Sequence, residues 1–269
     1  MIRTIQNFGA LATSPLRTDA LEIVEAAFSS IDTKAVLHNS ITVMDDIMTV
    51  MGQRFELKKY KHIYIVGFGK VSCRAAYVLE ELLKGKIKDG AVVGIKEVTC
   101  EIVDTYAGTH PLPSHFNVTA TRHIQEIAQK ATADDLVLVV VSGGGSALLC
   151  SSIDECEQGQ KLYDAFLRSG GTIDELNIVR QHLSRLKGGG LAKVLYPATV
   201  VSLIFSDVPG GDMTSIASGP TFPGTSRIAD AQAIIDKYGL GQYRLTDTLL
   251  DETYFVRVHN ILVASNLTA

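Results

Sequence analysis

Residues 136–149 read LVLVVVSGGGSALL, an apolar run that ends in three glycines flanked by serines. The six residues Leu136–Val141 are apolar and mostly branched, which is typical of a strand buried on both faces, as in a parallel sheet. Gly143, Gly144 and Gly145 have no Cβ, so their backbone can approach a ligand and turn successive N–H groups toward it. The stretch therefore predicts a buried strand followed by an anion-binding loop.

The two serines extend this prediction. Ser142 ends the strand, and Ser146 is expected to cap a helix that begins at Ala147, whose N-terminus adds partial positive charge at the same point. The expected ligand is a phosphate or a carboxylate. The alternative is a turn that only joins strand to helix, but three consecutive glycines cost conformational entropy. It is not a Walker A loop, because no Gly-Lys-Ser/Thr follows.

Strands, loops and helices alternate over residues 59–269. Further strands are predicted at 62–66, 91–95, 199–205 and 259–264. This alternation predicts an α/β fold: a doubly wound, mostly parallel, Rossmann-like sheet with helices on both faces. Residues 1–58 are expected to form a helical segment that packs on the sheet, with one helix from Thr18 and another over 41–51.

The composition is that of a soluble cytoplasmic protein. The 269 residues include 25 basic and 29 acidic ones, a net charge of −4, and no Lys/Arg stripe, so nucleic acid is not an expected partner. The four cysteines form no CxxC pair and are expected to be reduced thiols. Apolar runs are only strand-sized and the N-terminus lacks a signal-peptide core, so no membrane segment is expected.

Charged side chains directly follow two predicted strands. Lys70 ends the sequence GFGK, where an ammonium can reach a bound phosphate or carboxylate, although most lysines are simply solvated. Asp207 follows strand 199–205, at the edge where open α/β sheets gather ligands, and could hold Mg²⁺ or take a proton. Asp212 is either a second metal ligand or a turn residue beside two glycines.

Other polar candidates lie further along the chain. A helix with a capping box at 172–175 is expected to reach the glycines at 188–190, which puts Arg180, Ser184 and Lys187 on one face. Basic residues near a helix C-terminus also suit the helix dipole, and that alternative covers Lys187. His110 could line a site, although a histidine beside proline is more often a satisfied turn residue.

Four segments together resemble the glycerate 2-kinase family, whose C-terminal half carries the MOFRL domain. They are GFGK at 67–70, VVVSGGGSALL at 139–149, NIVRQHLSRLKGG at 177–189, and SDVPG followed by IASGPT at 206–221. The resemblance spans roughly residues 60–269 and implies transfer of the γ-phosphoryl group of ATP to the 2-hydroxyl of D-glycerate, with Mg²⁺. It also implies that this chain is the N-terminal domain without the MOFRL domain, and therefore a partial enzyme.

The resemblance implies roles for the candidates. Lys70 would stabilise the transferring phosphoryl group, and Asp207 would hold Mg²⁺ or orient the 2-hydroxyl, with Asp212 as a second metal ligand. The loop from Ser142 to Ser146 would bind the substrate carboxylate or a nucleotide phosphate. Further anion ligands would be Arg180, Lys187, Ser218 and Asn266. The family has an acidic residue where this chain has Gly211 and an aspartate where it has Ser114, which leaves Asp212 and the 108–114 loop without a firm role.

Two other functions remain open. A nicotinamide-dependent hydroxypyruvate reductase is suggested by the turn GFGKVS, but Ser72 replaces its third glycine and no ribose-binding acid is evident about 20 residues on. A non-catalytic ligand-binding fragment is the third. The expected partners are D-glycerate and a nucleotide, with a homodimer as a further candidate.

Overall fold

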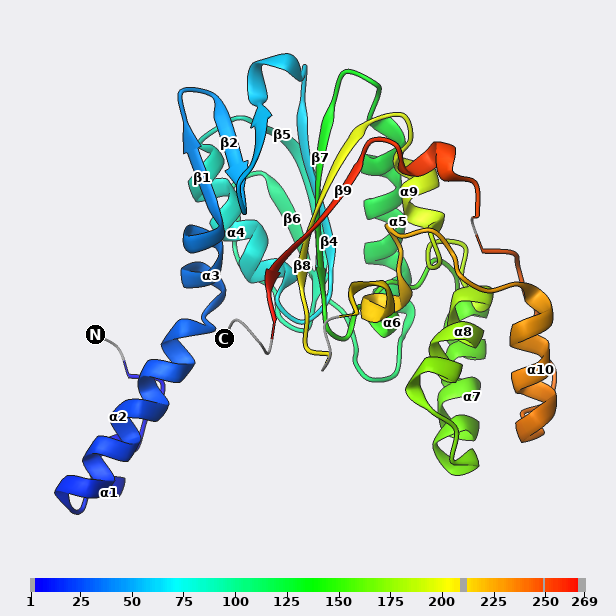
Figure 1. Cartoon of the computed structure of the whole chain (residues 1–269), viewed down its shortest axis with the longest axis horizontal. Coiled ribbons are helices and arrows are strands. Elements are labelled where there is room, and N and C mark those ends of the chain that lie inside the picture. The colour runs from blue at the N-terminus through cyan, green and yellow to red at the C-terminus, as the bar shows by residue number, and fades with distance from the viewer. Residues whose placement is uncertain (1–2, 209–211, 249, 266–269) are drawn as a thin grey trace.

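The computed structural model describes residues 3–208, 212–248 and 250–265. Its centre is a six-stranded parallel sheet in the order β6-β5-β4-β7-β8-β9 (Figure 1). The strands are β4 (Ile63–Phe68), β5 (Ile87–Gly94), β6 (Val103–Ala107), β7 (Leu136–Ser142), β8 (Thr199–Phe205) and β9 (Val258–Ala264). Numbered from β4, this is the 3-2-1-4-5-6 order of a doubly wound Rossmann sheet, so the predicted fold class is confirmed.

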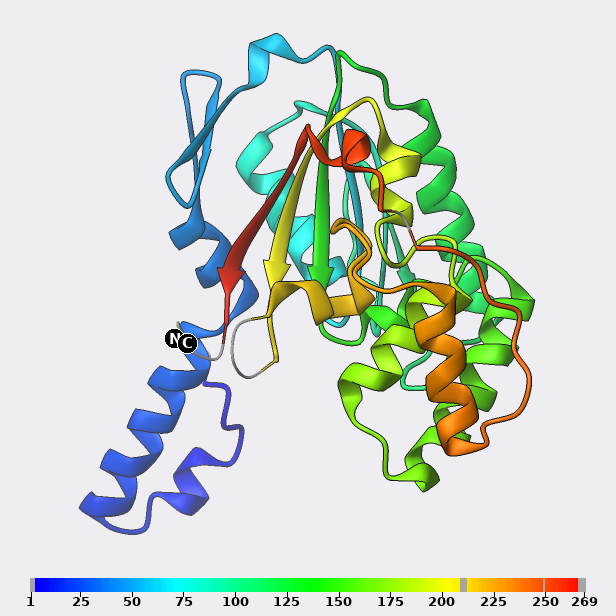
Figure 2. The ribbon, with the colours of Figure 1, turned by 45° about the vertical axis from the view of Figure 1, so that its right-hand side comes forward.

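Helices cover both faces because the central strands are apolar on both sides. Alternate residues of β7 pack into two hydrophobic clusters, one on each face. The first cluster includes α4 (Ser72–Leu83), and the second includes α5 (His115–Lys130) and α9 (Gly190–Leu195). A separate group packs together at one side of the sheet (Figure 1 and Figure 2): α7 (Ile153–Ser169), α8 (Ile173–Leu183) and α10 (Ile228–Tyr238).

The N-terminal region differs from the predicted helical segment. Residues 41–51 are not a helix but belong to an antiparallel sheet of β1 (Ile41–Met44), β2 (Ile47–Val50) and β3 (Gln53–Glu56). Asp45 and Asp46 turn the chain with positive φ angles of 48° and 63°. In β2 the more buried residues alternate, as in a strand, and do not recur every three or four residues.

The first helices do not pack on the sheet. α2 (Pro15–Ser30) has no buried residue, and with α1 (Phe8–Leu11) it extends away from the body of the molecule (Figure 2). Next along the chain, α3 (Thr33–Ser40) contacts the main domain through α4 and β9. The short helices η1 (Leu57–Lys59), α6 (Gly145–Leu148), η2 (Met213–Ser218) and η3 (Glu252–Phe255) complete the elements. In the part of the chain that the structure describes, every helix is too short or too polar to cross a membrane.

Two local predictions are wrong. α8 ends at Leu183 and not at the glycines, because Ser184 is extended and its Oγ accepts the N–H groups of Leu186 and Lys187 at 3.2 and 3.3 Å. Arg180 and Lys187 therefore do not share one helix face. The prediction of reduced thiols is wrong for Cys150 and Cys156, which form a disulfide where the chain turns back between α6 and α7.

Asp135 joins the beginnings of β4 and β7. Its Oδ1 accepts the backbone N–H of His62 at 3.1 Å and lies 3.0 Å from that residue's Nδ1. Its Oδ2 accepts the N–H and hydroxyl of Thr132 at 2.8 and 2.7 Å. Burial alone would raise the pKa of Asp135, but the hydrogen bonds from Thr132 and His62 outweigh burial and lower it.

We expect Asp135→Asn to lower the free energy of unfolding by about 2 kcal/mol at pH 7. Since the folded-state pKa lies below the unfolded value of about 3.9, this contribution is present above that pH and is lost as pH falls through the folded-state pKa. Urea unfolding at pH 7 and pH 3 should therefore show a large difference from wild type that shrinks in acid. The exposed neighbour gives the control, Asp134→Asn, and equal losses for both variants would contradict the prediction.

Candidate functional site

The loops after β4 and β7 meet at the point where the strand order reverses. Open α/β sheets bind ligands in the crevice at such a point. The Lys70 N–H donates to the Gly143 carbonyl at 3.0 Å, and the Val71 N–H donates to Ser142 Oγ at 3.3 Å. A Cβ at Gly69, where φ is +121°, would lie 2.1 Å from Ser142 Oγ. The predicted GFGK and SGGGS motifs therefore form one surface.

Two of the three loop glycines face charged or polar side chains. A Cβ at Gly143 would lie 2.0 Å from Oδ2 of Asp207, which follows β8. A Cβ at Gly144, where φ is +83°, would lie 3.0 Å from the His110 ring and 3.2 Å from Cγ of Lys70. The loop thus brings together side chains from the ends of three neighbouring strands and from the loop after β6.

The third glycine faces the interior. A Cβ at Gly145 would lie 2.6 Å from that of Ala217 and 3.0 Å from the Phe68 ring. Gly144 is the N-cap of α6, so Ser146 lies inside that helix and does not cap it as predicted. Because α6 has only four residues, its dipole adds little. The anion-binding prediction therefore depends on Gly143 and Gly144, which face the polar side chains, and on the nearby cations.

His110 lies close enough to Lys70, Arg180 and Asp207 for all three charges to affect its pKa. Burial lowers its pKa most, Lys70 and Arg180 lower it further, and Asp207 opposes them. The imidazole is thus neutral at pH 7. Lys70 and Asp207 are exposed, and neither forms an ion pair within the described residues. The structure therefore places His110, which the sequence left undecided, inside the site.

A chain of polar side chains supports the loop from behind. Ser146 Oγ lies 3.0 Å from Ser218 Oγ, and the Ser218 hydroxyl donates to Oδ1 of Asn177 at 3.2 Å. Ala217 and Ser218 have φ angles of +51° and +61°, a conformation that costs non-glycine residues about 1 kcal/mol or more each. Ser218 is fully buried, and its hydroxyl contacts Ser146 and Asn177 inside the protein. The sequence analysis does not single out Asn177.

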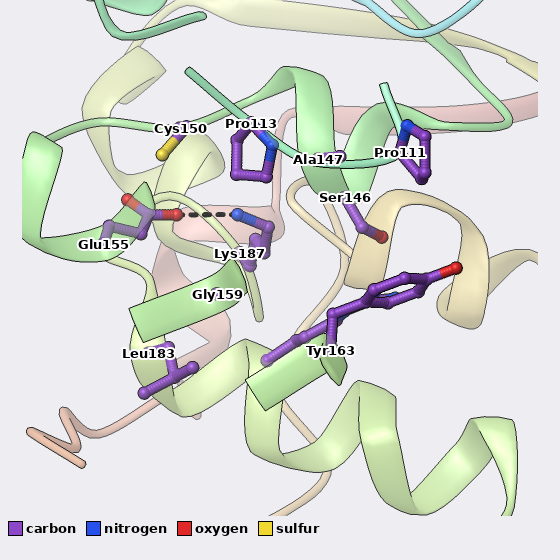
Figure 3. A pocket seen from close by; sticks show the side chains of 11 residues that line it. Pro111, Pro113, Ser146, Ala147, Cys150, Glu155, Gly159, Tyr163, Leu183 and Lys187 are labelled. Carbon is purple, nitrogen blue, oxygen red and sulfur yellow. Dashed lines mark hydrogen bonds and ion pairs between the residues drawn. The ribbon is translucent and has the colours of Figure 1, made fainter. Parts of the chain in front are cut away.

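Arg180 is one of the residues that line a recess beside α6. The wall includes Ser146, Tyr163 from α7, and the two prolines of the 108–114 loop (Figure 3). The guanidinium Cζ lies 5.8 Å from the Tyr163 ring centroid. Burial lowers the pKa of Arg180, with the Tyr163 phenol opposing it. Among the described residues this half-buried cation has no carboxylate partner.

Lys187, predicted as an anion ligand, already has a partner. Its Nζ lies 2.7 Å from Oε1 of Glu155 and donates to the Leu149 carbonyl at 2.8 Å (Figure 3). Both side chains of the pair are buried, with exposures of 5% and 7%. Glu155 Oε2 in turn accepts the N–H and hydroxyl of Ser151. Lys187 therefore joins three segments of the fold, and its charge is neutralised.

We expect Glu155→Gln to lower the free energy of unfolding by about 3 kcal/mol, because it leaves a buried ammonium without its anion. The double variant Glu155→Met with Lys187→Met should recover most of that loss, since similar-sized apolar groups replace the pair. Urea unfolding measures both. The exposed pair of Glu56 with Lys59 supplies the control Glu56→Gln, and a loss at Glu155 no larger than at Glu56 would refute the assignment.

The remaining predicted residues lie at the edge of the site or beyond the described residues. Oδ1 of Asp212 accepts the N–H and hydroxyl of Thr214 at 2.9 and 2.7 Å, as a cap of η2. Asn266 lies outside the described residues. The described residues contain no group of three or more His, Cys, Asp or Glu side chains that could hold a metal ion.

Sequence comparisons find relatives that are named for glycerate kinases. A D-glycerate 2-kinase of Thermotoga maritima is 39% identical over 66% of this chain and 44% of its own length. A relative from Agrobacterium vitis, 40% identical over 65% of this chain and 41% of its own length, has a name that refers to hydroxypyruvate reductase. The chain thus spans less than half the length of these two relatives.

The fold comparison agrees with the sequence comparison. The crystal structure of a glycerate kinase from Thermotoga maritima matches with a TM-score of 0.77 and 30% identity, over 93% of this chain and 59% of that one. A family model described as a domain of unknown function, DUF4147, matches residues 19–250. With most of its length matched by that model, the chain belongs to the DUF4147 family, whose relatives here include glycerate kinases.

Proposed function

We propose that the protein transfers the γ-phosphoryl group of ATP to the 2-hydroxyl of D-glycerate, giving 2-phosphoglycerate. The observation that carries the proposal is the meeting of Lys70, Asp207 and two glycines of the loop after β7 at the switch point of the sheet. Phosphoryl transfer requires positioning and charge stabilisation from the protein, with little covalent chemistry. The names of the two Thermotoga maritima proteins, D-glycerate 2-kinase and glycerate kinase, support the same reaction.

The exposed side chains have distinct roles in this reaction. The Lys70 ammonium stabilises negative charge on the transferring phosphoryl group, and Gly144, which has no side chain, allows phosphate oxygens to approach the backbone beside Lys70. The Asp207 carboxylate orients the 2-hydroxyl or holds Mg²⁺, with Asp212 as a second ligand. A single carboxylate fits Mg²⁺, because nucleotide phosphates commonly supply its other ligands. When bound, that ion neutralises phosphate charge.

The reductase alternative requires the turn after β4 to hold a pyrophosphate. The space beside the glycines of this turn is instead filled by neighbouring atoms. A Cβ at Gly67 would lie 2.9 Å from that of Val140, and the space beside Gly69 is filled by Ser142. These glycines therefore allow close packing between β4 and β7, which supports the kinase over the reductase.

A coupled ADP-release assay tests the proposal. With ATP and Mg²⁺ present, we expect ADP release to depend on D-glycerate, with little release for D-lactate, glycolate or glycerol. Titration of NADH should leave its fluorescence unchanged. Hydroxypyruvate-dependent oxidation of NADH, without ADP release on D-glycerate, would overturn the kinase assignment in favour of the reductase.

A further inference from the structure

We infer that the recess beside α6 is the subsite for the substrate's carboxylate and neighbouring hydroxyl, separate from the phosphate-binding face at Lys70. In this subsite Arg180 and Tyr163 take the carboxylate, and Ser146 accepts a hydrogen bond from the hydroxyl. The inference rests on the proposed function, because it names how one substrate of that reaction is recognised.

The charge balance of the recess favours an incoming anion. Two cations line it, Arg180 and Lys187, but Glu155 already neutralises Lys187 at 2.7 Å. Arg180 is half-buried beside the Tyr163 ring and has no carboxylate partner among the described residues. A planar guanidinium binds a carboxylate through two parallel hydrogen bonds, and the Tyr163 hydroxyl adds a donor beside it.

The size of the recess selects a small group. Its free volume is about 30 Å³, which is room for about two water-sized groups. A carboxylate head fits that space, whereas a nucleotide triphosphate does not. Pro111 and Pro113 form part of the wall, and their fixed φ angles limit its expansion. The phosphates are thereby left to the open face at Gly143, Gly144 and Lys70.

The hydrogen-bond direction at Ser146 selects a hydroxyl. Because the Ser218 hydroxyl donates its proton to Asn177, the 3.0 Å contact between the two serines needs Ser146 as the donor. Ser146 Oγ then keeps its lone pairs for an incoming donor. A carboxylate at pH 7 has no proton to donate, but a hydroxyl next to it does. Ser146 and Tyr163 lie on facing sides of the recess (Figure 3), so one small hydroxy acid can contact both.

The test is calorimetric binding to the whole chain, with D-glycerate, D-glyceramide and 3-hydroxypropanoate as probes. D-glyceramide lacks the charged carboxylate, and 3-hydroxypropanoate lacks the 2-hydroxyl. Wild type should bind D-glycerate more tightly than either analogue. Arg180→Met should weaken D-glycerate roughly 10- to 100-fold and abolish the preference over D-glyceramide. Ser146→Ala should weaken D-glycerate by about 3- to 10-fold and abolish the preference over 3-hydroxypropanoate.

Two controls separate the outcomes. Arg168→Met removes an exposed arginine from the same helix as Tyr163 and should change no affinity. ATP affinity should stay within twofold in Arg180→Met. The subsite is refuted if wild type does not bind D-glycerate, if Arg180→Met binds it normally, or if that variant loses ATP affinity instead. If the preferences appear as expected but no ADP is released, the subsite stands and the kinase proposal fails.

Discussion

Replacing Lys70 with Met is expected to lower kcat for phosphoryl transfer to D-glycerate by about 100-fold or more, with a smaller change in KM. The ammonium stabilises charge that develops mainly in the transition state, and loss of one preorganised donor typically has an effect of this order. The Lys70 backbone N–H donates to the Gly143 carbonyl at 3.0 Å, and the variant keeps this hydrogen bond. The geometry of the glycine loop should therefore survive the substitution.

Steady-state kinetics with D-glycerate and ATP as varied substrates measure this effect. Lys88→Met is the matched control, because Lys88 is also exposed but lies on β5 and should not affect kcat. A Lys70→Met variant with kcat near that of wild type would show that Lys70 is an ordinary solvated surface lysine without a catalytic role. A large rise in KM for ATP at constant kcat would make Lys70 a binding residue that does not act on the transition state.

Gly144→Val is expected to abolish ATP binding while the fold remains. A side chain there is strained at φ +83° and meets the His110 ring and Lys70, both of which belong to the site. Gly145→Ala should act in the opposite way. Its Cβ meets Ala217 and Phe68 in the core, so it should lower the free energy of unfolding by about 1–3 kcal/mol.

Calorimetric titration and urea unfolding of both variants separate these effects. Gly144→Val should remain within about 2 kcal/mol of wild-type stability, the cost of one strained backbone position. The anion-loop assignment would be wrong if a folded Gly144→Val protein bound ATP with unchanged affinity. A Gly144→Val protein that unfolds while Gly145→Ala is unaffected would show that the two glycines have been given the wrong environments.

The sheet was predictable because its central strands are buried on both faces. β7 and β8 are long apolar runs that end in polar loops, and the structure has them at Leu136–Ser142 and Thr199–Phe205. Such an apolar run identifies a buried strand by itself, without knowledge of the strands that pair with it. The parallel arrangement then brings the strand ends together, so Lys70 and Asp207 both reach the glycine loop as their positions suggested.

The failures concern contacts between distant segments. The family resemblance implies an anion-binding role for Lys187, but its partner Glu155 lies 32 residues earlier and only the fold shows that they meet. The predicted helix over 41–51 is wrong because a short apolar run fits the period of a helix as well as that of a strand. The turn at Asp45 and Asp46 makes the segment a hairpin. His110 enters the site through a loop, and Asn177 enters it from α8, and the local sequence does not define where either segment lies in the fold.

Identification of the phosphorylated product tests the central claim most directly. The protein is incubated with ATP, Mg²⁺ and D-glycerate, and the product is followed by ³¹P nuclear magnetic resonance beside the Lys70→Met variant. The account predicts a signal that matches authentic 2-phosphoglycerate in the wild-type sample, forming at least about 100-fold more slowly in the variant. A 3-phosphoglycerate signal, or equal rates of product formation in the two samples, would contradict it.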